Sequence, residues 1–161
     1  MVKKSLSSHP QAAGNDTFKN ISAEAIDLAE VISKAHHPKA GAVVLFSGEV
    51  RNHSAGREVS YLDYEAYDAM ADKMIDEIVK LAKKKFDLHN AVCIHRVGKV
   101  AVCETAIVVV TCSSHRAEAY AANRYIIDRV KHEAPIWKRE YFADGSVEWA
   151  HNCSCHDHKP H

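Results

Sequence analysis

The chain has 161 residues, of which 47% are hydrophobic and 26% are charged, and its 21 basic and 21 acidic residues balance to a formal net charge of zero. This length suits one domain with a buried core, and the balanced charge excludes the strongly basic footprint of a nucleic-acid-binding protein. No apolar run is long enough to span a membrane, and the N-terminal lysines are not followed by the apolar segment of a secretory signal.

The cysteine pattern and the ends of the chain set the expected compartment and domain limits. Five cysteines, without the regular spacing of a disulfide framework, favour a reducing compartment, so we expect a cytoplasmic protein. Residues 1–20 are polar and are expected to form a flexible tail, residues 21–150 the domain, and residues 151–161 a flexible tail rich in cysteine and histidine.

Hydrophobic periodicity divides the domain into helices and strands. In chain order we expect a helix over residues 22–35, strands over 42–50 and 59–67, a helix over 68–86, strands over 91–98 and 105–112, a helix over 113–134, and a hairpin of strands 136–142 and 146–150. Paired strands between helices indicate an α+β domain with a mixed, mostly antiparallel sheet, three main helices and a C-terminal hairpin.

Side chains that cap helices mark two of the expected starts. Ser22 can cap the first helix, where Ile21 and Ile26 have the spacing of a hydrophobic staple. Ser113 or Ser114 can cap the third helix. No glycine-rich turn of the GxGxxG or P-loop kind precedes a helix, so the common nucleotide-binding folds are disfavoured.

Two segments place cations beside the ends of expected elements. Arg51 follows a strand and opens a polar loop. His115 and Arg116 lie in the first turn of the third helix, where a cation opposes the helix dipole but free N–H groups bind anions. These side chains suit a phosphate or carboxylate ligand, and a solvated surface position is the alternative for each of them.

The segment KHEAPIWKRE places two further cations on either side of a helix break. Lys131 lies in the last helical turn, Pro135 stops the helix, and Lys138 lies near the start of a strand. A turn there can bring two ammonium groups into one pocket, where burial and like charge favour loss of a proton. Such a lysine can act as a general acid, a general base or a nucleophile, while a cation that only complements the helix dipole is the alternative for Lys131.

Three cysteine or histidine features remain. The tail over residues 151–161 has two cysteines and four histidines and could bind a soft metal, but its Cys-x-Cys spacing favours a tail without a defined site. Cys112 ends an apolar strand, so a small buried hydrophobe is favoured over a nucleophile. The His95–Arg96 pair lies at a strand end, and the residues alone assign it no role.

Together these segments resemble one family, the large, catalytic subunits of molybdopterin synthase, or MoaE family. The matching stretches are FSGEVRNHSAGREVSYLDYEAYDAMA, IHRVG, SSHRAEAYAA and KHEAPIWKRE, in the family's order and spacing over about residues 20–150. Ser47 stands where an apolar residue is more usual, and Cys103 stands where a glycine often precedes the glutamate. The N-terminal tail and the Cys/His-rich tail fall outside the match.

The resemblance implies an α/β-hammerhead-like fold and a sulfurtransferase of molybdenum cofactor biosynthesis. A homodimer would bind two small ubiquitin-like sulfur carriers to form a heterotetramer. The carrier's C-terminal Gly-Gly, as a thiocarboxylate, would deliver sulfur to cyclic pyranopterin monophosphate (precursor Z) and so form the dithiolene of molybdopterin. Because the sulfur arrives on the partner, no cysteine of this chain, no metal and no cofactor is expected at the site.

The resemblance also implies roles for individual residues. Six positions match the family's functional residues: the catalytic Lys131 and Lys138, and the substrate-binding Phe46, Arg51, His115 and Arg116. Lys131 would lie against the carrier's C-terminus and move protons, and Lys138 would bind substrate and stabilise developing negative charge. His115 and Arg116 would come from the neighbouring subunit of the dimer.

Two other functions stay open at this stage. A non-catalytic module could dock a ubiquitin-like tail, although it would not need three groups of cations. A metal-handling protein could be built around residues 151–161, which deletion of that tail would reveal.

Overall fold

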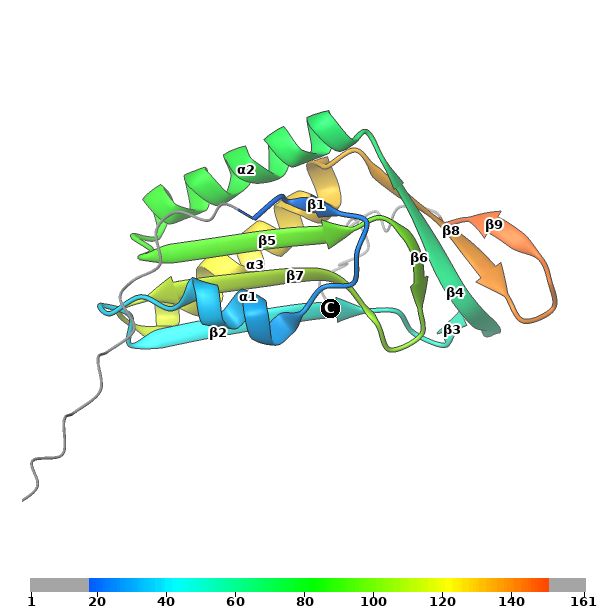
Figure 1. Cartoon of the computed structure of the whole chain (residues 1–161), viewed down its shortest axis with the longest axis horizontal. Coiled ribbons are helices and arrows are strands. Elements are labelled where there is room, and N and C mark those ends of the chain that lie inside the picture. The colour runs from blue at the N-terminus through cyan, green and yellow to red at the C-terminus, as the bar shows by residue number, and fades with distance from the viewer. Residues whose placement is uncertain (1–17, 151–161) are drawn as a thin grey trace, which may run out of the picture.

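Residues 18–150, which the computed structural model describes, alternate between helices and pairs of strands (Figure 1). The elements are β1 (Ile21–Ser22), α1 (Leu28–Ala35), β2 (Ala42–Glu49), β3 (His53–Ser54), β4 (Arg57–Ala66), α2 (Asp68–Lys85), β5 (Asn90–Arg96), β6 (Gly98–Ala101), β7 (Thr105–Ser113), α3 (Arg116–Glu133), β8 (Ile136–Phe142) and β9 (Val147–Trp149). The predicted α+β class, with three helices and a C-terminal hairpin, is confirmed. The prediction of two flexible tails concerns mainly residues outside the described range.

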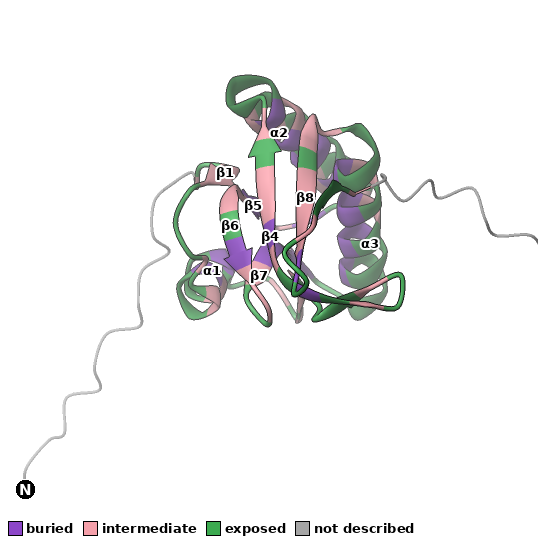
Figure 2. Cartoon of the chain, turned by 90° about the vertical axis from the view of Figure 1, so that its right-hand side faces the viewer, coloured by how far each residue is buried: buried purple, intermediate pink, exposed green. Residues whose placement is uncertain are grey.

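The strands form two sheets. The main sheet has the order β1-β5-β7-β2, and its pairs are antiparallel except for β1 with β5. The second sheet has the order β3-β4-β8-β9, and β6 also pairs with β4. Figure 1 shows the second sheet across one end of the main sheet, and Figure 2 views the molecule from that end, with β4 and β8 half-buried along most of their length.

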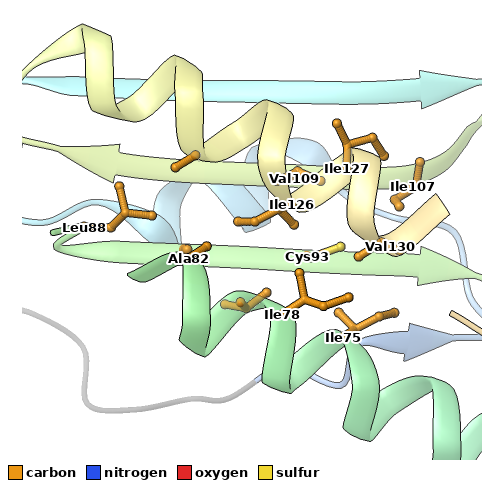
Figure 3. Close-up of a cluster of buried hydrophobic side chains, with 13 residues drawn as sticks. Ile75, Ile78, Ala82, Leu88, Cys93, Ile107, Val109, Ile126, Ile127 and Val130 are labelled. Atoms are coloured by element: carbon orange, nitrogen blue, oxygen red, sulfur yellow. The ribbon is translucent and has the colours of Figure 1, made fainter. Parts of the chain in front are cut away.

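The main core fills the space between the main sheet and helices α2 and α3 (Figure 3). Strand residues that alternate toward the helices, such as Cys93 and Val109, contribute with Ile75 and Ile126 of the helices to one buried cluster. Burial of each large aliphatic side chain contributes about 1.5–3 kcal/mol. The opposite face of the sheet is covered by α1 and has a smaller cluster, so both sheet faces are buried.

Buried polar side chains fix α3 along the sheet. The side-chain amide of Asn123 donates to the carbonyl oxygens of Val44 and Val109, both at 3.0 Å. The hydroxyl of Thr111 donates to the carbonyl oxygen of Ala119 at 2.7 Å. Because a buried polar group without a partner is costly, these bonds disfavour sliding of the N-terminal half of the helix along the sheet.

The predicted start of the first helix is wrong. Helix α1 begins at Leu28, and Asp27 caps it by accepting a hydrogen bond from the backbone N–H of Glu30 at 3.1 Å. Ser22 instead belongs to β1, where its carbonyl oxygen accepts from the N–H of Val97 at 2.8 Å. A two-residue edge strand has no hydrophobic period of its own, so the pattern could not predict it.

The predicted hydrophobic staple is also absent from this helix start. Ile21 packs against the core under α2 and α3, whereas Ile26 packs against the core under α1. The two side chains therefore lie on opposite faces of the main sheet.

The predicted cap of the third helix is wrong as well. His115 occupies the N-cap position of α3 and makes no side-chain cap bond. Ser113 is buried at the end of β7, and the hydroxyl of Ser114 lies 2.7 Å from Nε2 of His89. Neither serine therefore caps the helix, because Ser113 belongs to β7 and the hydroxyl of Ser114 is paired with His89.

One predicted strand is two strands in the structure, and one predicted loop contains a short strand. The stretch 91–98 breaks between the sheets, because Gly98 has φ +83°, a left-handed conformation that favours glycine. The polar loop predicted to open at Arg51 contains β3 and leads into β4, and the two strands are joined through Ala55 and Gly56.

The described cysteines Cys93, Cys103 and Cys112 are free thiols. Cys112 is fully buried and its thiol donates to the carbonyl oxygen of Ala35 at 3.1 Å, which confirms the interpretation of Cys112 as a core residue.

None of the described helices is both long and apolar enough to cross a membrane. The cytoplasmic location stays a prediction.

Candidate active site at one end of the main sheet

A buried histidine lies at the end of strand β5. Ala91, Cys93 and His95 form one alternating row on the face covered by α2 and α3, and His95 exposes only 8% of its surface. Its Nδ1 lies 2.7 Å from the carbonyl oxygen of Arg96. A carbonyl oxygen only accepts hydrogen bonds, so in the neutral ring Nδ1 carries the proton and Nε2 is an acceptor.

Two lysines lie close to this histidine. Burial lowers the pKa of His95 to about 4, the hydrogen bond with Arg96 opposes that shift, and the charges of Lys131 and Lys138 lower the pKa further. The backbone brings both lysines to this end of the sheet: Val130, next to Lys131, packs in the same core cluster as Ile107, which pairs with His95. Lys138 lies opposite Tyr64, whose ring contacts the ring of His95. The fold therefore places both predicted lysines within electrostatic range of one neutral imidazole, and we call Lys131, Lys138 and His95 the lysine site.

The turn after α3 brings the second lysine to this place. Ala134 has an extended conformation, with φ −69° and ψ 134°, as predicted for a residue before proline. The carbonyl oxygen of Pro135 accepts from the N–H of Tyr67 at 3.2 Å, at the start of α2. The chain then enters β8, and Lys138 lies opposite Tyr64 of β4. Pro135 is thus the corner between α3, which carries Lys131, and β8, which carries Lys138.

Tyr64 and Glu140 complete the surroundings of the lysine site. The Tyr64 ring stands edge-on to the His95 ring, with centroids 4.9 Å apart. Burial, and then the charge of Glu140, raise the pKa of Tyr64 to about 12, so its phenol stays protonated. Glu140 lies two residues beyond Lys138 on the same face of β8, and it places a negative charge among the cations.

Lys131 differs from the arginine that precedes it on α3. Arg129 is held by the carboxylate of Glu133 at 2.6 Å and by the hydroxyl of Tyr125 at 2.7 Å. Lys131 is exposed and makes no ion pair with any described residue. Its ammonium group is therefore available to a ligand.

Arg51 lies at the same end of the main sheet. Ile107 of β7 pairs with His95 on one side and with Gly48 on the other, so His95 and Gly48 are two strand spacings, about 10 Å, apart. Arg51 follows β2 directly beyond this point and is exposed. The structure thus groups Arg51 with the two lysines.

Phe46 lies earlier on β2, half-buried against the core under α2 and α3. A Cβ added at Gly48 would lie 3.3 Å from Cε1 of Phe46 and 2.7 Å from Cγ2 of Ile107. The absence of a side chain at Gly48 therefore leaves room for the aromatic ring of Phe46.

His115 and Arg116 lie at the opposite end of the sheet. Ser113 pairs with Ala42, the first residue of β2, and both predicted cations follow it in exposed positions. Helix α3 separates Arg116 from Lys131 by 15 residues, or about 22 Å. Within one chain, the six predicted residues therefore form two separate groups.

Sequence reasoning did not select His95 or Tyr64 as site residues. A sequence signal for His95 is present, because it continues the buried alternation of Ala91 and Cys93 with a titratable side chain.

A hollow lined by Phe18, Lys34 and Val97, among others, includes none of the six predicted residues. Among residues 18–150, no three His, Cys, Asp or Glu side chains are grouped to hold a metal ion, and the Cys/His-rich tail lies outside that range.

Comparison with known proteins assigns the chain to a family. Residues 21–133 match the MoaE protein family. The chain belongs to this family. This MoaE protein is 40% identical over 134 residues to the molybdopterin synthase catalytic subunit of Thermoplasma volcanium, covering 83% of this chain and 98% of that protein. It is 39% identical over 143 residues to the molybdopterin synthase catalytic subunit of Dictyostelium discoideum, covering 86% of this chain and 90% of that protein.

Solved structures share the fold of this MoaE protein. The crystal structure of molybdopterin synthase from Staphylococcus aureus aligns with a TM-score of 0.78 and 32% identity, over 89% of this chain and 99% of that chain. A complex of subunits 1 and 2 of molybdopterin-converting factor from Helicobacter pylori aligns with a TM-score of 0.69 and 23% identity, over 84% of this chain and 91% of that chain, which is a likeness of fold. Family and fold confirm the predicted resemblance to the catalytic subunits of molybdopterin synthase, which are sulfurtransferases of molybdenum cofactor biosynthesis.

Proposed function

We propose that this MoaE protein is the catalytic subunit of a molybdopterin synthase that transfers sulfur to cyclic pyranopterin monophosphate and forms the molybdopterin dithiolene. The observation that carries the proposal is the gathering of Lys131 and Lys138 around the buried, neutral His95 in a chain of this family. Each transfer would leave the carrier with a carboxylate in place of its thiocarboxylate, so two carriers are used for each dithiolene.

The lysines would perform different tasks. Lys131 is exposed and free of ion pairs with the described residues, so its ammonium group can attract the carrier's anionic thiocarboxylate and give or take a proton there. Lys138 is half-buried between Tyr64 and Glu140, where a fixed cation can bind substrate and stabilise developing negative charge.

The remaining site residues would bind the substrate. Arg51 would hold the cyclic phosphate through charge-assisted hydrogen bonds, and Phe46 would shape the place for the pterin. His115 and Arg116 would complete the phosphate contacts from a second copy of the chain, because about 22 Å of helix separates Arg116 from Lys131 in one copy. This separation supports the proposed homodimer.

The proposed sulfur donor is a small ubiquitin-like carrier with a C-terminal Gly-Gly thiocarboxylate, one for each subunit of a heterotetramer. The resemblance implies this partner, and the Helicobacter pylori fold relative is itself a complex of two subunits. The exposed lysine and arginine at one end of the sheet have the charge that an anionic chain end requires.

A reconstituted assay tests the function. The protein is mixed with a thiocarboxylated carrier and precursor Z, and molybdopterin is measured; the carrier with an ordinary C-terminal carboxylate is the control. We expect product only with the thiocarboxylate. The proposal is wrong if no product forms under conditions in which a known synthase is active.

The two alternative functions predict different results. A docking module would bind the carrier without turnover. A metal-handling protein would lose its function when residues 151–161 are deleted, whereas we expect the synthase to keep its activity, because none of the proposed site residues lies there.

A further inference from the structure

The proposed mechanism leaves His95 without a task. An apolar residue in its place would continue the row of Ala91 and Cys93 without the cost of burying a polar ring. A histidine there is also unable to charge easily, since burial and both lysines lower its pKa. Its position at the lysine site therefore calls for a role that a neutral imidazole can fill.

The ring presents one unused acceptor. Nδ1 donates to the carbonyl oxygen of Arg96, and Tyr64 packs edge-on against the ring, so the orientation of the imidazole is held from two sides. Nε2 makes no hydrogen bond with any described residue. The charges that act on the ring are those of Lys131 of α3 and Lys138 of β8, and the charge of Glu140 of β8 acts on Tyr64.

We propose that His95 is a positioning residue for Lys131, whose ammonium group donates a hydrogen bond to Nε2 when the substrate site is filled. The Lys131 side chain is exposed in the structure, so ligand binding would draw it inward from solvent. This inference rests on the proposed function, because it assigns His95 to the same reaction.

A neutral acceptor suits a lysine that must exchange protons. A carboxylate in this position would form an ion pair, favour the charged ammonium and so retain its proton. An imidazole held as the Nδ1–H tautomer orients the ammonium through one hydrogen bond and adds no opposite charge. The hydrogen bond to Nε2 would thereby fix the position of the Lys131 ammonium group and leave its proton transferable.

Two amide variants separate positioning from packing. In His95→Gln the side-chain oxygen can take the place of Nε2, while the bond to the Arg96 carbonyl is lost. In His95→Asn the side-chain amide can take the place of Nδ1, while the acceptor for Lys131 is lost. We expect His95→Asn to lower kcat roughly tenfold or more, the rate equivalent of one hydrogen bond to a charged group, and His95→Gln to lower it clearly less.

The assay uses the full chain with thiocarboxylated carrier, and KM for precursor Z is measured beside kcat. We expect KM to change little in both variants, because the proposed bond orients a lysine and does not contact substrate. An equal loss in both variants, or a smaller loss in His95→Asn, overturns the proposal in favour of packing. No product from the unsubstituted protein would instead contradict the proposed function.

A measurement on the unsubstituted chain does not depend on the folding of a variant or on turnover. Nitrogen NMR of the histidine side chains is recorded with and without precursor Z and carrier. We expect His95 to show a protonated Nδ1 and an unprotonated Nε2, whose resonance shifts on addition of ligands in the wild type and not in Lys131→Ala. A protonated Nε2, or an equal shift in both proteins, overturns the proposal.

Discussion

The two ends of helix α3 both carry cations, but the cations stand there for different physical reasons. At the C-terminal end, Lys131 complements the negative end of the helix dipole and costs no stability. At the N-terminal end, His115 and Arg116 stand at the positive end, and His115 provides no side-chain cap. In the proposed function these two cations oppose the dipole because they bind the anionic substrate.

The ends also differ in their surroundings. The C-terminal end leads through Pro135 into β8, and its Lys131 acts, together with Lys138 of β8, on the buried His95. The N-terminal end is exposed and follows the far end of β7. One chain therefore has the lysine site at one end and a separate pair of cations at the other, which is the arrangement that the proposed sharing of a site between two copies requires.

The largest expected effect is at the C-terminal end. Lys131→Ala should lower kcat about 100-fold or more, the usual contribution of a positioned acid or base. The fold should persist, because the side chain is exposed. Turnover is measured in the reconstituted assay and folding by circular dichroism.

Lys84→Ala is the matched control, since Lys84 is an exposed lysine in the last turn of α2. It should have nearly wild-type turnover. Near-normal turnover in Lys131→Ala would contradict the role given to that lysine.

The link between the two ends can be tested by mixing two inactive variants. Arg116→Ala and Lys131→Ala proteins are each assayed alone, and then together after exchange of subunits. If a site combines the two ends from different chains, the mixture should recover about a quarter of wild-type activity, because half of the dimers are mixed and each has one intact site. Recovery is measured against unmixed samples at equal total concentration. An inactive mixture that contains mixed dimers would exclude the shared site.

The lysine site should make the fold sensitive to acid. The pKa of His95 is about 4 in the folded protein and 6.5 is its usual value, so between these pH values the unfolded chain binds more protons. The stabilisation is fully present above pH 6.5 and is lost as pH falls through 4, by about 3 kcal/mol in the free energy of unfolding. Urea unfolding across this range should show a steeper loss for wild type than for His95→Gln.

His132→Gln gives the control for acid sensitivity, because His132 is an exposed histidine of the same helix. Its pH dependence should follow that of wild type. Parallel curves for wild type and His95→Gln would show that the burial of His95 does not make it a weak base.

The smallest expected effect concerns a backbone conformation near Arg51. Cys103 has φ +68°, which an L-residue adopts at a cost of about 1 kcal/mol and glycine adopts freely. Its N–H donates to the carbonyl oxygen of Val50 at 2.9 Å, which fixes this turn beside the residue that precedes Arg51. Cys103→Gly should raise the free energy of unfolding by about 1 kcal/mol in urea titrations.

Cys103→Ala separates the thiol from the conformation, because it removes the sulfur and keeps the Cβ. We expect no gain in stability from it. An equal gain in both variants would assign the effect to the loss of the thiol.

The amount that sequence could predict differs between elements. Helix α2 and strand β7 follow long, regular patterns, so the predictions of residues 68–86 and 105–112 are confirmed closely. Strand β1 is too short to show a period, and the predicted start of α1 is wrong for that reason. The local pattern predicts one strand over residues 91–98. It cannot show the change of sheet at Gly98, because that change depends on which strands lie nearby in the fold.

The sequence by itself determined the types of most elements, the break at Pro135 and the family of the chain, because periodicity, turn chemistry and motif order are local properties. Only the tertiary structure decided which cations meet. Sheet order and register bring Lys131, Lys138 and Arg51 to one end, and the length of α3 keeps Arg116 about 22 Å away. The weak basicity of His95 arises in the same way, since burial and neighbouring charge exist only in the folded chain.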